Sequence, residues 1–147
     1  MSDAARPRRS TSGHDLTPPD AATRARLEAA LDDEERRVIL AQGTERPFCG
    51  GLLDEHRAGR FACRLCGLPL FSSAGKFNSG SGWPSFFTPL DADHIRHLDD
   101  RSHGMRRTEI RCARCDGHLG HVFDDGPPPS GLRYCVNSLS LRFIAEV

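Results

Sequence analysis

Six cysteines carry the clearest chemistry in this chain of 147 residues. Four of them form two pairs, each with two residues between its members, and we call these pairs the knuckles: Cys63 with Cys66, and Cys112 with Cys115. A tight turn at this spacing directs both thiolates at one ion, and two such turns complete the tetrahedron that zinc prefers. The knuckles therefore predict a structural zinc site with no open position for catalysis. A CxxC redox pair is the alternative, and Cys49 and Cys135 remain for other chemistry.

Cys135 lies in a polar-flanked, extended segment, residues 133–138. A cysteine acts as a nucleophile through its thiolate, which forms where positive charge or hydrogen-bond donors lie near. Arg133 and Asn137 can supply these, together with His118 and His121 if their strands are neighbours. The segment predicts a reactive thiol, against the alternative of an inert core cysteine.

The two histidines and the only tryptophan complete the candidate site. His118 and His121 can donate protons near neutral pH or bind a metal, but four cysteines already fill a tetrahedron. Their predicted role is therefore proton donation or hydrogen bonding to a substrate. Trp83 follows a loop of small residues, 79–82, and can present an indole face to a small apolar group. A tryptophan buried beside a turn is the alternative.

Short extended segments must position these side chains. From residue 61 onward such segments alternate with Gly, Pro, Ser and Asp. The predicted strands are residues 61–62, 68–71, 86–88, 95–98, 105–111, 118–123, 132–136 and 139–144. No helix-length segment separates them, so the crossovers of a parallel sheet are missing. The predicted body is mainly β, a small antiparallel β-sandwich or barrel with helices at its N-terminal side.

Two short helices precede the strands. A proline pair at positions 18–19 marks the start of the first, in which Leu27 and Leu31 lie at helical spacing. Asp32 begins the second as its N-cap, with Glu35 three residues on as in a capping box. Gly43 is expected to end this helix in the left-handed conformation.

Composition excludes some classes of function. The chain has 20 basic and 20 acidic residues, so no overall field steers it toward nucleic acid or an anionic membrane. It lacks both a membrane span of roughly 18 apolar residues and a secretion signal, which predicts a cytoplasmic protein. Residues 1–15 are predicted to be a disordered tail and residues 16–147 a single domain. We expect a monomer without an organic cofactor.

Five segments together resemble the methionine-R-sulfoxide reductases, the MsrB family. They are residues 43–48 (GTERPF), 79–86 (SGSGWPSF), 111–115 (RCARC), 118–127 (HLGHVFDDGP) and 133–138 (RYCVNS). The resemblance runs from about Leu31 to Phe143. It implies a sandwich-like fold of two antiparallel sheets and a four-cysteine zinc site remote from the active site. It also implies reduction of methionine R-sulfoxide, protein-bound or free, with thioredoxin as the reductant.

The resemblance also implies a role for each matching residue. Cys135 is similar to the nucleophile that attacks the sulfoxide sulfur and is left as a sulfenic acid. Trp83 and Phe123 would cradle the methyl group, and Arg133 would shape the electrostatics. The groups that would hydrogen-bond or protonate the sulfoxide oxygen are His118, His121 and Asn137.

One position departs from a common pattern of that family. Many relatives carry a resolving cysteine between the two glycines where this chain has Ser81. Serine forms no disulfide, so the sulfenic acid is either reduced directly or resolved by another thiol. Our hypothesis is that Cys49, in a hinge-like setting before two glycines, resolves it, which requires the two Cα atoms to come within about 7 Å. The alternative is that Cys49 is a buried bystander.

Two other functions are compatible with parts of the sequence. A non-catalytic zinc-ribbon-like module that binds protein or nucleic acid explains the knuckles but leaves Trp83 and Cys135 without a role. A thiol oxidoreductase that uses one CxxC as a redox pair would free the zinc ligands for exchange.

Overall fold

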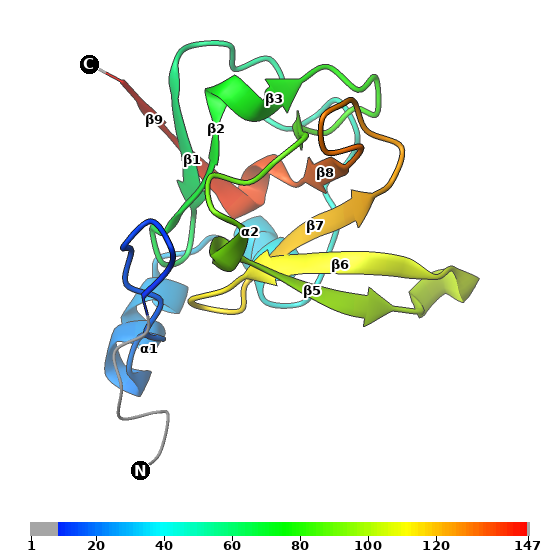
Figure 1. Cartoon of the computed structure of the whole chain (residues 1–147). Coiled ribbons are helices and arrows are strands. Elements are labelled where there is room, and N and C mark those ends of the chain that lie inside the picture. The colour runs from blue at the N-terminus through cyan, green and yellow to red at the C-terminus, as the bar shows by residue number, and fades with distance from the viewer. Residues whose placement is uncertain (1–8, 147) are drawn as a thin grey trace.

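The computed structural model describes residues 9–146, and antiparallel β-sheets dominate it (Figure 1). The smaller sheet has three strands in the order β2 (Pro69–Ser72), β1 (Gly59–Cys63), β9 (Leu141–Ala145). The larger sheet has six in the order β3 (Lys76–Phe77), β4 (Ser85–Phe86), β8 (Arg133–Val136), β7 (His118–Phe123), β6 (Arg107–Cys112), β5 (Ile95–Asp100). Because β3 and β5 are free edges, the larger sheet does not close into a barrel. The predicted fold of two antiparallel sheets is confirmed.

The strand predictions match the structure in eight of the nine strands. Each predicted segment overlaps one observed strand, with ends that differ by up to two residues. The missed strand, β3, has only two residues and pairs with β4 through Lys76 and Phe77. A strand of that length carries no alternation of apolar and polar residues that a sequence could reveal.

Aromatic side chains join the two sheets. Phe71 of β2 stacks on Phe86 of β4 with 4.3 Å between ring centroids, and Phe61 of β1 meets the same ring edge-on at 5.1 Å. All three side chains are fully buried. Pairs of this kind add about 0.5–1.5 kcal/mol each beyond the burial of their area. The sheets therefore form a sandwich with an aromatic centre.

Both predicted N-terminal helices are present, α1 (Ala21–Ala29) and α2 (Asp33–Ile39). The capping box is confirmed, because Asp32 accepts from the Glu35 amide and the Glu35 carboxylate accepts from the Asp32 amide. Gly43 does not supply the left-handed residue after α2. Gln42 does, with φ of 58°, and Gly43 is needed for space, since a Cβ there would lie 2.7 Å from the Arg37 carbonyl oxygen.

Four short 3₁₀ helices connect the strands: η2 (Ser73–Gly75), η3 (Ala92–His94), η4 (Ser102–Gly104) and η5 (Ser138–Ser140). The last follows β8 directly, and α2 packs against it. Through this contact the N-terminal helices lie close to the end of β8, where Asn137 begins the turn.

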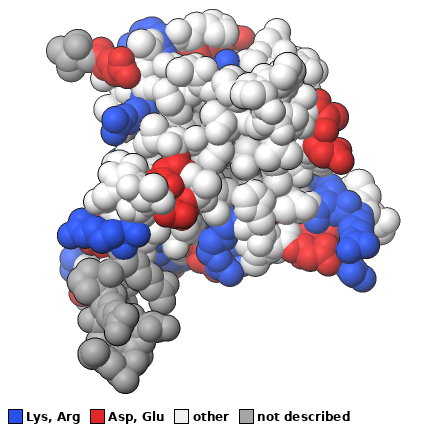
Figure 2. Space-filling model, viewed as in Figure 1, with Lys and Arg blue, Asp and Glu red and all other residues white. Residues whose placement is uncertain are grey.

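Residues 1–8 of the predicted tail lie outside the described residues. Residues 9–15 form a turn closed by a bridge between Arg9 and Asp15, and the Ser12 amide and hydroxyl donate to Asp91 at 2.8 and 2.7 Å. No helix in the described part of the chain is long and apolar enough to cross a bilayer. Basic and acidic side chains are interspersed on the face shown in Figure 2. The division into one tail and one domain stays a prediction.

Candidate functional site

The four knuckle cysteines converge at one point between the two sheets. Cys63 ends β1 and Cys112 ends β6, and the two turns that follow carry Cys66 and Cys115. Their sulfurs all lie within 4.8 Å of one another, with two pairs 3.5 Å apart. An ion bound at about 2.3 Å from each sulfur would hold them roughly 3.8 Å apart, so the four thiols fit a tetrahedral metal site.

The two knuckles have the same backbone course but use different residues for it. Gly67 follows the first knuckle with φ of 83°, and Asp116 follows the second with φ of 65°. Gly117, the next residue, does not take such an angle. It is needed for space, since a Cβ there would lie 3.0 Å from a methyl of Ile39 and 3.3 Å from the Cys115 sulfur. Its amide donates to that sulfur at 3.4 Å.

Crowding of the thiols favours a bound cation. Hydrogen bonds with the neighbouring thiols, together with burial, raise the pKa of Cys63 and of Cys112. A divalent ion at the centre reverses this preference, because a coordinated thiol loses its proton. The donor set of four sulfurs suits zinc or an iron centre better than magnesium or calcium.

Cys135 lies in a separate cavity of about 290 Å³ on the larger sheet. Its strand, β8, runs between β4 and β7, where Cys135 pairs with Ser85 on one side and His121 on the other. Gly120 permits this close approach, because a Cβ there would lie 2.0 Å from the Cys135 carbonyl oxygen. The residues that line the cavity with Cys135 are Thr44, Ser81, Trp83, Arg107, Gly120, His121, Phe123, Arg133 and Asn137.

The Cys135 thiol is half-buried beside polar side chains. The Ser81 hydroxyl lies 3.8 Å from its sulfur. Burial raises the pKa of Cys135, while Ser81 and Arg133 act in the opposite direction without cancelling it. The substrate-free protein therefore holds Cys135 mainly as the thiol at neutral pH.

Glu45 holds Trp83 and Asn137 in place through its backbone. Its carbonyl accepts from the Trp83 indole at 3.0 Å, and its amide donates to the Asn137 side-chain oxygen at 3.0 Å. The Asn137 amide nitrogen donates to the Leu119 carbonyl at 3.1 Å. An amide has two N–H donors, so Asn137 keeps one for the cavity. Trp83 is half-buried beside it and forms part of the wall.

Arg133 and Phe123 form the opposite wall. The guanidinium lies 4.4 Å from the centroid of the Phe123 ring, a cation–π contact. It also binds Asp125 through two hydrogen bonds of 2.8 and 3.2 Å. These contacts fix the Arg133 side chain at the rim, and the bond with Asp125 raises its pKa.

His121 faces the cavity and is bound from behind by a carboxylate. Its Nε2 lies 2.7 Å from Asp100 Oδ2, and Arg107 lies 3.4 Å from the same oxygen. The Ser102 backbone amide donates to the other carboxylate oxygen at 2.9 Å. This bond and the one from His121 hold the pKa of Asp100 well below its usual range. Asp100 is therefore ionised, and Nε2 carries a proton.

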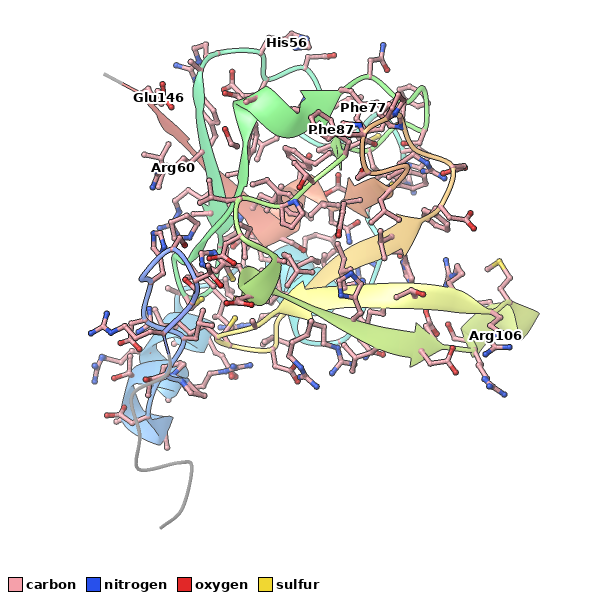
Figure 3. The ribbon with its side chains drawn as sticks, in the orientation of Figure 1. His56, Arg60, Phe77, Phe87, Arg106 and Glu146 are labelled. Carbon is pink, nitrogen blue, oxygen red and sulfur yellow. The ribbon has the colours of Figure 1, made fainter. Side chains whose placement is uncertain are left out.

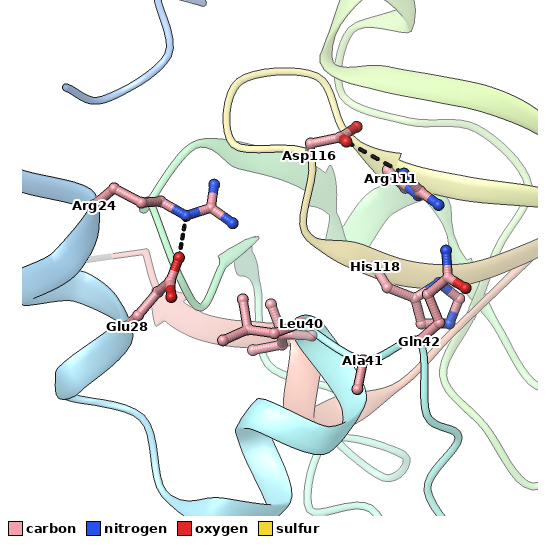
Figure 4. Close-up of a pocket in the computed structure, with 9 residues that line it drawn as sticks. Arg24, Glu28, Leu40, Ala41, Gln42, Arg111, Asp116 and His118 are labelled. Carbon is pink, nitrogen blue, oxygen red and sulfur yellow. Dashed lines mark hydrogen bonds and ion pairs between the residues drawn. The ribbon is translucent and has the colours of Figure 1, made fainter. Parts of the chain in front are cut away.

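His118 does not line this cavity. It is buried, and its Nδ1 lies 2.6 Å from Glu109 Oε2. Figure 4 shows it beside Gln42, in a hollow of about 430 Å³ between the N-terminal helices and the larger sheet. Its ring is 5.7 Å from that of His121, and burial lowers the pKa of His118. His118 is thus a neutral histidine beside the site rather than in its wall.

Cys49 also lies outside the cavity lining. It is exposed rather than buried. Its neighbour Phe48, with φ of 64°, donates from its amide to the Gly82 carbonyl at 2.6 Å. Gly82 follows Ser81, whose hydroxyl contacts the Cys135 sulfur. Two short chain segments therefore connect Cys49 to the edge of the site.

The sequence did not reveal the residues that hydrogen-bond to the predicted side chains and fix their positions. Glu45, Asp100 and Glu109 bind the predicted residues from other segments of the chain, and Arg107 binds Asp100. Glu45 stood in one of the recognised segments, 43–48, but no local pattern pointed to its contacts. Asp100 ends β5 and Glu109 lies within β6, and no local pattern marks either carboxylate, so only the strand register brings them to the histidines.

Comparison with known proteins agrees with this geometry. The SelR domain family model matches residues 31–145. A protein of Caulobacter vibrioides (strain NA1000 / CB15N) named peptide methionine sulfoxide reductase MsrB is 62% identical over 135 residues, covering 92% of this chain and 85% of that protein. Proteins of the same name from Xylella fastidiosa (strain M23) and Thiobacillus denitrificans are 62% and 55% identical, covering 88% and 82% of this chain and 84% and 92% of their own. The chain therefore belongs to the SelR domain family, that of the MsrB methionine sulfoxide reductases.

Proposed function

We propose that this chain is a peptide-methionine (R)-sulfoxide reductase that acts through Cys135. The family relationship supports methionine sulfoxide reduction and an oxidoreductase acting on sulfur. The observation that carries the proposal is one cavity that unites the Cys135 thiol, the Trp83 indole, His121 and Asn137. These are a nucleophile, an apolar wall and two polar groups for an oxygen.

The reaction at Cys135 transfers one oxygen atom. The Cys135 sulfur attacks the sulfoxide sulfur and takes the oxygen as the sulfur–oxygen bond of the substrate breaks. The thiol becomes a sulfenic acid, oxidised by two electrons, and the sulfoxide becomes a thioether. The proton of the thiol ends on the transferred oxygen, so no external proton is consumed. Protonation of that oxygen makes it easier to expel, which is the role we assign to His121.

Selection of one epimer follows from the two kinds of wall. A methionine sulfoxide carries an oxygen and a methyl group on the same sulfur. Trp83 and Phe123 offer apolar faces for the methyl, while Asn137 and His121 offer polar atoms for the oxygen. An epimer with these groups exchanged would leave buried polar groups unpaired, which a binding site rejects strongly.

A second thiol is needed to recycle the sulfenic acid as a disulfide. Ser81 lies beside Cys135 but cannot form one. Cys49 is exposed and follows Phe48, whose amide binds the carbonyl of Gly82 next to Ser81. We therefore assign Cys49 as the resolving thiol: its sulfur displaces the hydroxyl of the sulfenic acid, and water leaves. Thioredoxin would then reduce the disulfide. Movement of the segment around Cys49 would complete the approach, since Cys49 does not line the cavity.

His118 acts indirectly in this scheme. It is neutral, buried and hydrogen-bonded to Glu109, so its contribution is to fix the strand end and the neighbouring His121 ring. Zinc is the ion that we assign to the four knuckle cysteines, which would hold the two sheets together without taking part in the reaction. We place the protein in the cytoplasm as a monomer that acts on oxidised proteins, without nucleic acid, membrane or organic cofactor.

The test is an assay that resolves the two epimers. Separated R and S sulfoxides of N-acetylmethionine, with dithiothreitol as reductant, should show turnover of R alone. The Cys135→Ser variant should be inactive yet folded, with its zinc retained. Turnover of S, or activity that survives loss of the Cys135 thiol, would reject the proposal. A zinc-ribbon-like binding module would show no turnover at all, and a CxxC redox enzyme would lose activity with a knuckle cysteine rather than with Cys135.

A further inference from the structure

Two histidine–carboxylate pairs lie side by side across β5, β6 and β7. In one, His121 binds Asp100 at 2.7 Å, and in the other His118 binds Glu109 at 2.6 Å. An arginine supports each carboxylate: Arg107 lies 3.4 Å from Asp100, and Arg111 binds Glu109 with bonds of 2.9 and 3.0 Å. The arrangement occurs twice because Arg107, Glu109 and Arg111 are alternate residues of β6. They therefore face the same side of the sheet as both histidines.

The two pairs differ in their access to the reaction. His118 and Glu109 are both buried, with 3% and 5% of their surface exposed, and neither lines the catalytic cavity. His121 lines it directly opposite Cys135, as paired residues of adjacent antiparallel strands. Side chains at such positions have Cβ atoms about 4.5–5.5 Å apart. Only the His121 pair can therefore exchange a proton with Cys135.

We infer that Asp100 is a positioning residue for proton transfer by His121, an inference that rests on the proposed function. The Asp100 carboxylate keeps the proton of a neutral His121 on Nε2, which leaves Nδ1 as the acceptor for the Cys135 thiol proton. The imidazolium formed in this way then gives the Nδ1 proton to the sulfoxide oxygen. Asp100 stabilises that short-lived cation without being protonated itself, the part an aspartate plays behind a general-base histidine in other enzymes.

Charge and position both support this role for Asp100. The carboxylate is held at both oxygens, by the Ser102 amide on one and by His121 and Arg107 on the other. Arg107 also lines the cavity, so the Asp100 carboxylate orients two of its lining side chains, His121 and Arg107. The preceding residue in the hairpin differs: Arg106, at the far end in Figure 3, forms an ion pair with Asp99 at 3.8 Å and does not line the cavity.

Asp100→Asn is the variant that tests the inference, because its side-chain oxygen can still accept from the Ser102 amide while the charge is lost. Asp99→Asn is the matched control, since Asp99 is exposed and binds only arginines of the hairpin tip. The assay is single-turnover formation of methionine from N-acetylmethionine R-sulfoxide over a range of concentrations. It separates the limiting rate from the half-saturating concentration.

We expect the limiting rate of Asp100→Asn to fall roughly 10- to 100-fold, as for other residues that orient a reacting group from behind, with half-saturation within about twofold. Asp99→Asn should match the wild type. A loss of binding alone, or a limiting rate within about twofold of the wild type, would overturn the inference. If the inference about Asp100 is overturned but Cys135→Ser is inactive and the wild type reduces the R-sulfoxide, the proposed function stands. A wild type that does not turn over the R-sulfoxide would refute the proposed function itself.

A spectroscopic measurement tests the same point without relying on the variant to fold. Long-range ¹H–¹⁵N spectra report which nitrogen of a neutral histidine carries the proton. Neutral His121 of the wild type should show the Nε2–H form, and Asp100→Asn should shift it toward Nδ1–H. A wild-type His121 with its proton on Nδ1 would contradict the role given to Asp100.

Discussion

Loss of the metal site should lower the thermal stability of this protein far more than loss of the exposed Cys49 thiol. The Cys66→Ser variant is the sharpest perturbation, because Cys66 is the least buried ligand and its replacement leaves little empty space. The two knuckles join β1 of the smaller sheet to β6 of the larger one. Without an ion, these turns would be held together by apolar packing, weak contacts between thiols and the connecting loops.

The expected magnitude follows from the binding energy of such sites. A structural four-ligand zinc contributes about 10–16 kcal/mol at neutral pH, against a total of about 5–15 kcal/mol for a typical domain. Even one third of that contribution, about 4 kcal/mol, lowers Tm by roughly 8–16 °C for a chain of this size. Cys49→Ser is the control, as Cys49 is exposed and outside the cluster.

The assay pairs zinc content by elemental mass spectrometry with Tm from circular dichroism. Wild type and Cys49→Ser should hold one zinc per chain with the same Tm, and Cys66→Ser should lose both. A zinc-free Cys66→Ser protein with Tm within about 3 °C of the wild type would refute the reasoning that the ion holds the two sheets together.

Three further outcomes follow from the geometry. One equivalent of methionine R-sulfoxide should remove two free thiols from the wild type and one from Cys49→Ser, measured by thiol titration; a loss of two in the variant would exclude Cys49 as the resolving residue. Gly50→Ala should lower stability by about 1–3 kcal/mol in thermal or urea unfolding, because its Cβ would lie 2.2 Å from a buried carboxylate and from a serine hydroxyl, while Gly51→Ala, with open space around it, should be neutral. In a Cys49→Ser background, the rate of Cys135 alkylation by iodoacetamide should still increase above the ordinary pKa of a free thiol, about 8.5, because burial raises the pKa of Cys135. Arg133→Met should slow the reaction at each pH, and a wild-type rate that is constant above that ordinary pKa would contradict the expectation.

Local sequence patterns predicted most of the fold. The capping box of Asp32 and Glu35 depends only on neighbours in the chain, and it is present. The knuckle spacing likewise predicted a cluster of four thiols, which β1 of the smaller sheet and β6 of the larger sheet bring together. The role of Gly43 was harder to predict, because this glycine avoids a close contact with Arg37 of α2 and does not take the expected left-handed angle.

The site itself was only partly predictable. Six predicted residues meet in one cavity, because the neighbouring strands β7 and β8, with the turn after β8, carry five of them and the loop before β4 carries Trp83: Cys135, His121, Asn137, Trp83, Phe123 and Arg133. His118 and Cys49 lie outside that lining. The carboxylate behind His121 could not be found from sequence, since Asp100 comes 21 residues earlier and meets the ring only through the pairing of β5, β6 and β7.

The most direct test of the central claim is to identify the atom that receives the oxygen. Cys49→Ser protein is mixed with one equivalent of methionine R-sulfoxide in the presence of dimedone, which traps sulfenic acids, and its peptides are analysed by mass spectrometry. We predict one dimedone adduct per chain, on Cys135, together with one equivalent of methionine. Methionine formed without an adduct on Cys135, or an adduct on a knuckle cysteine, would contradict the account.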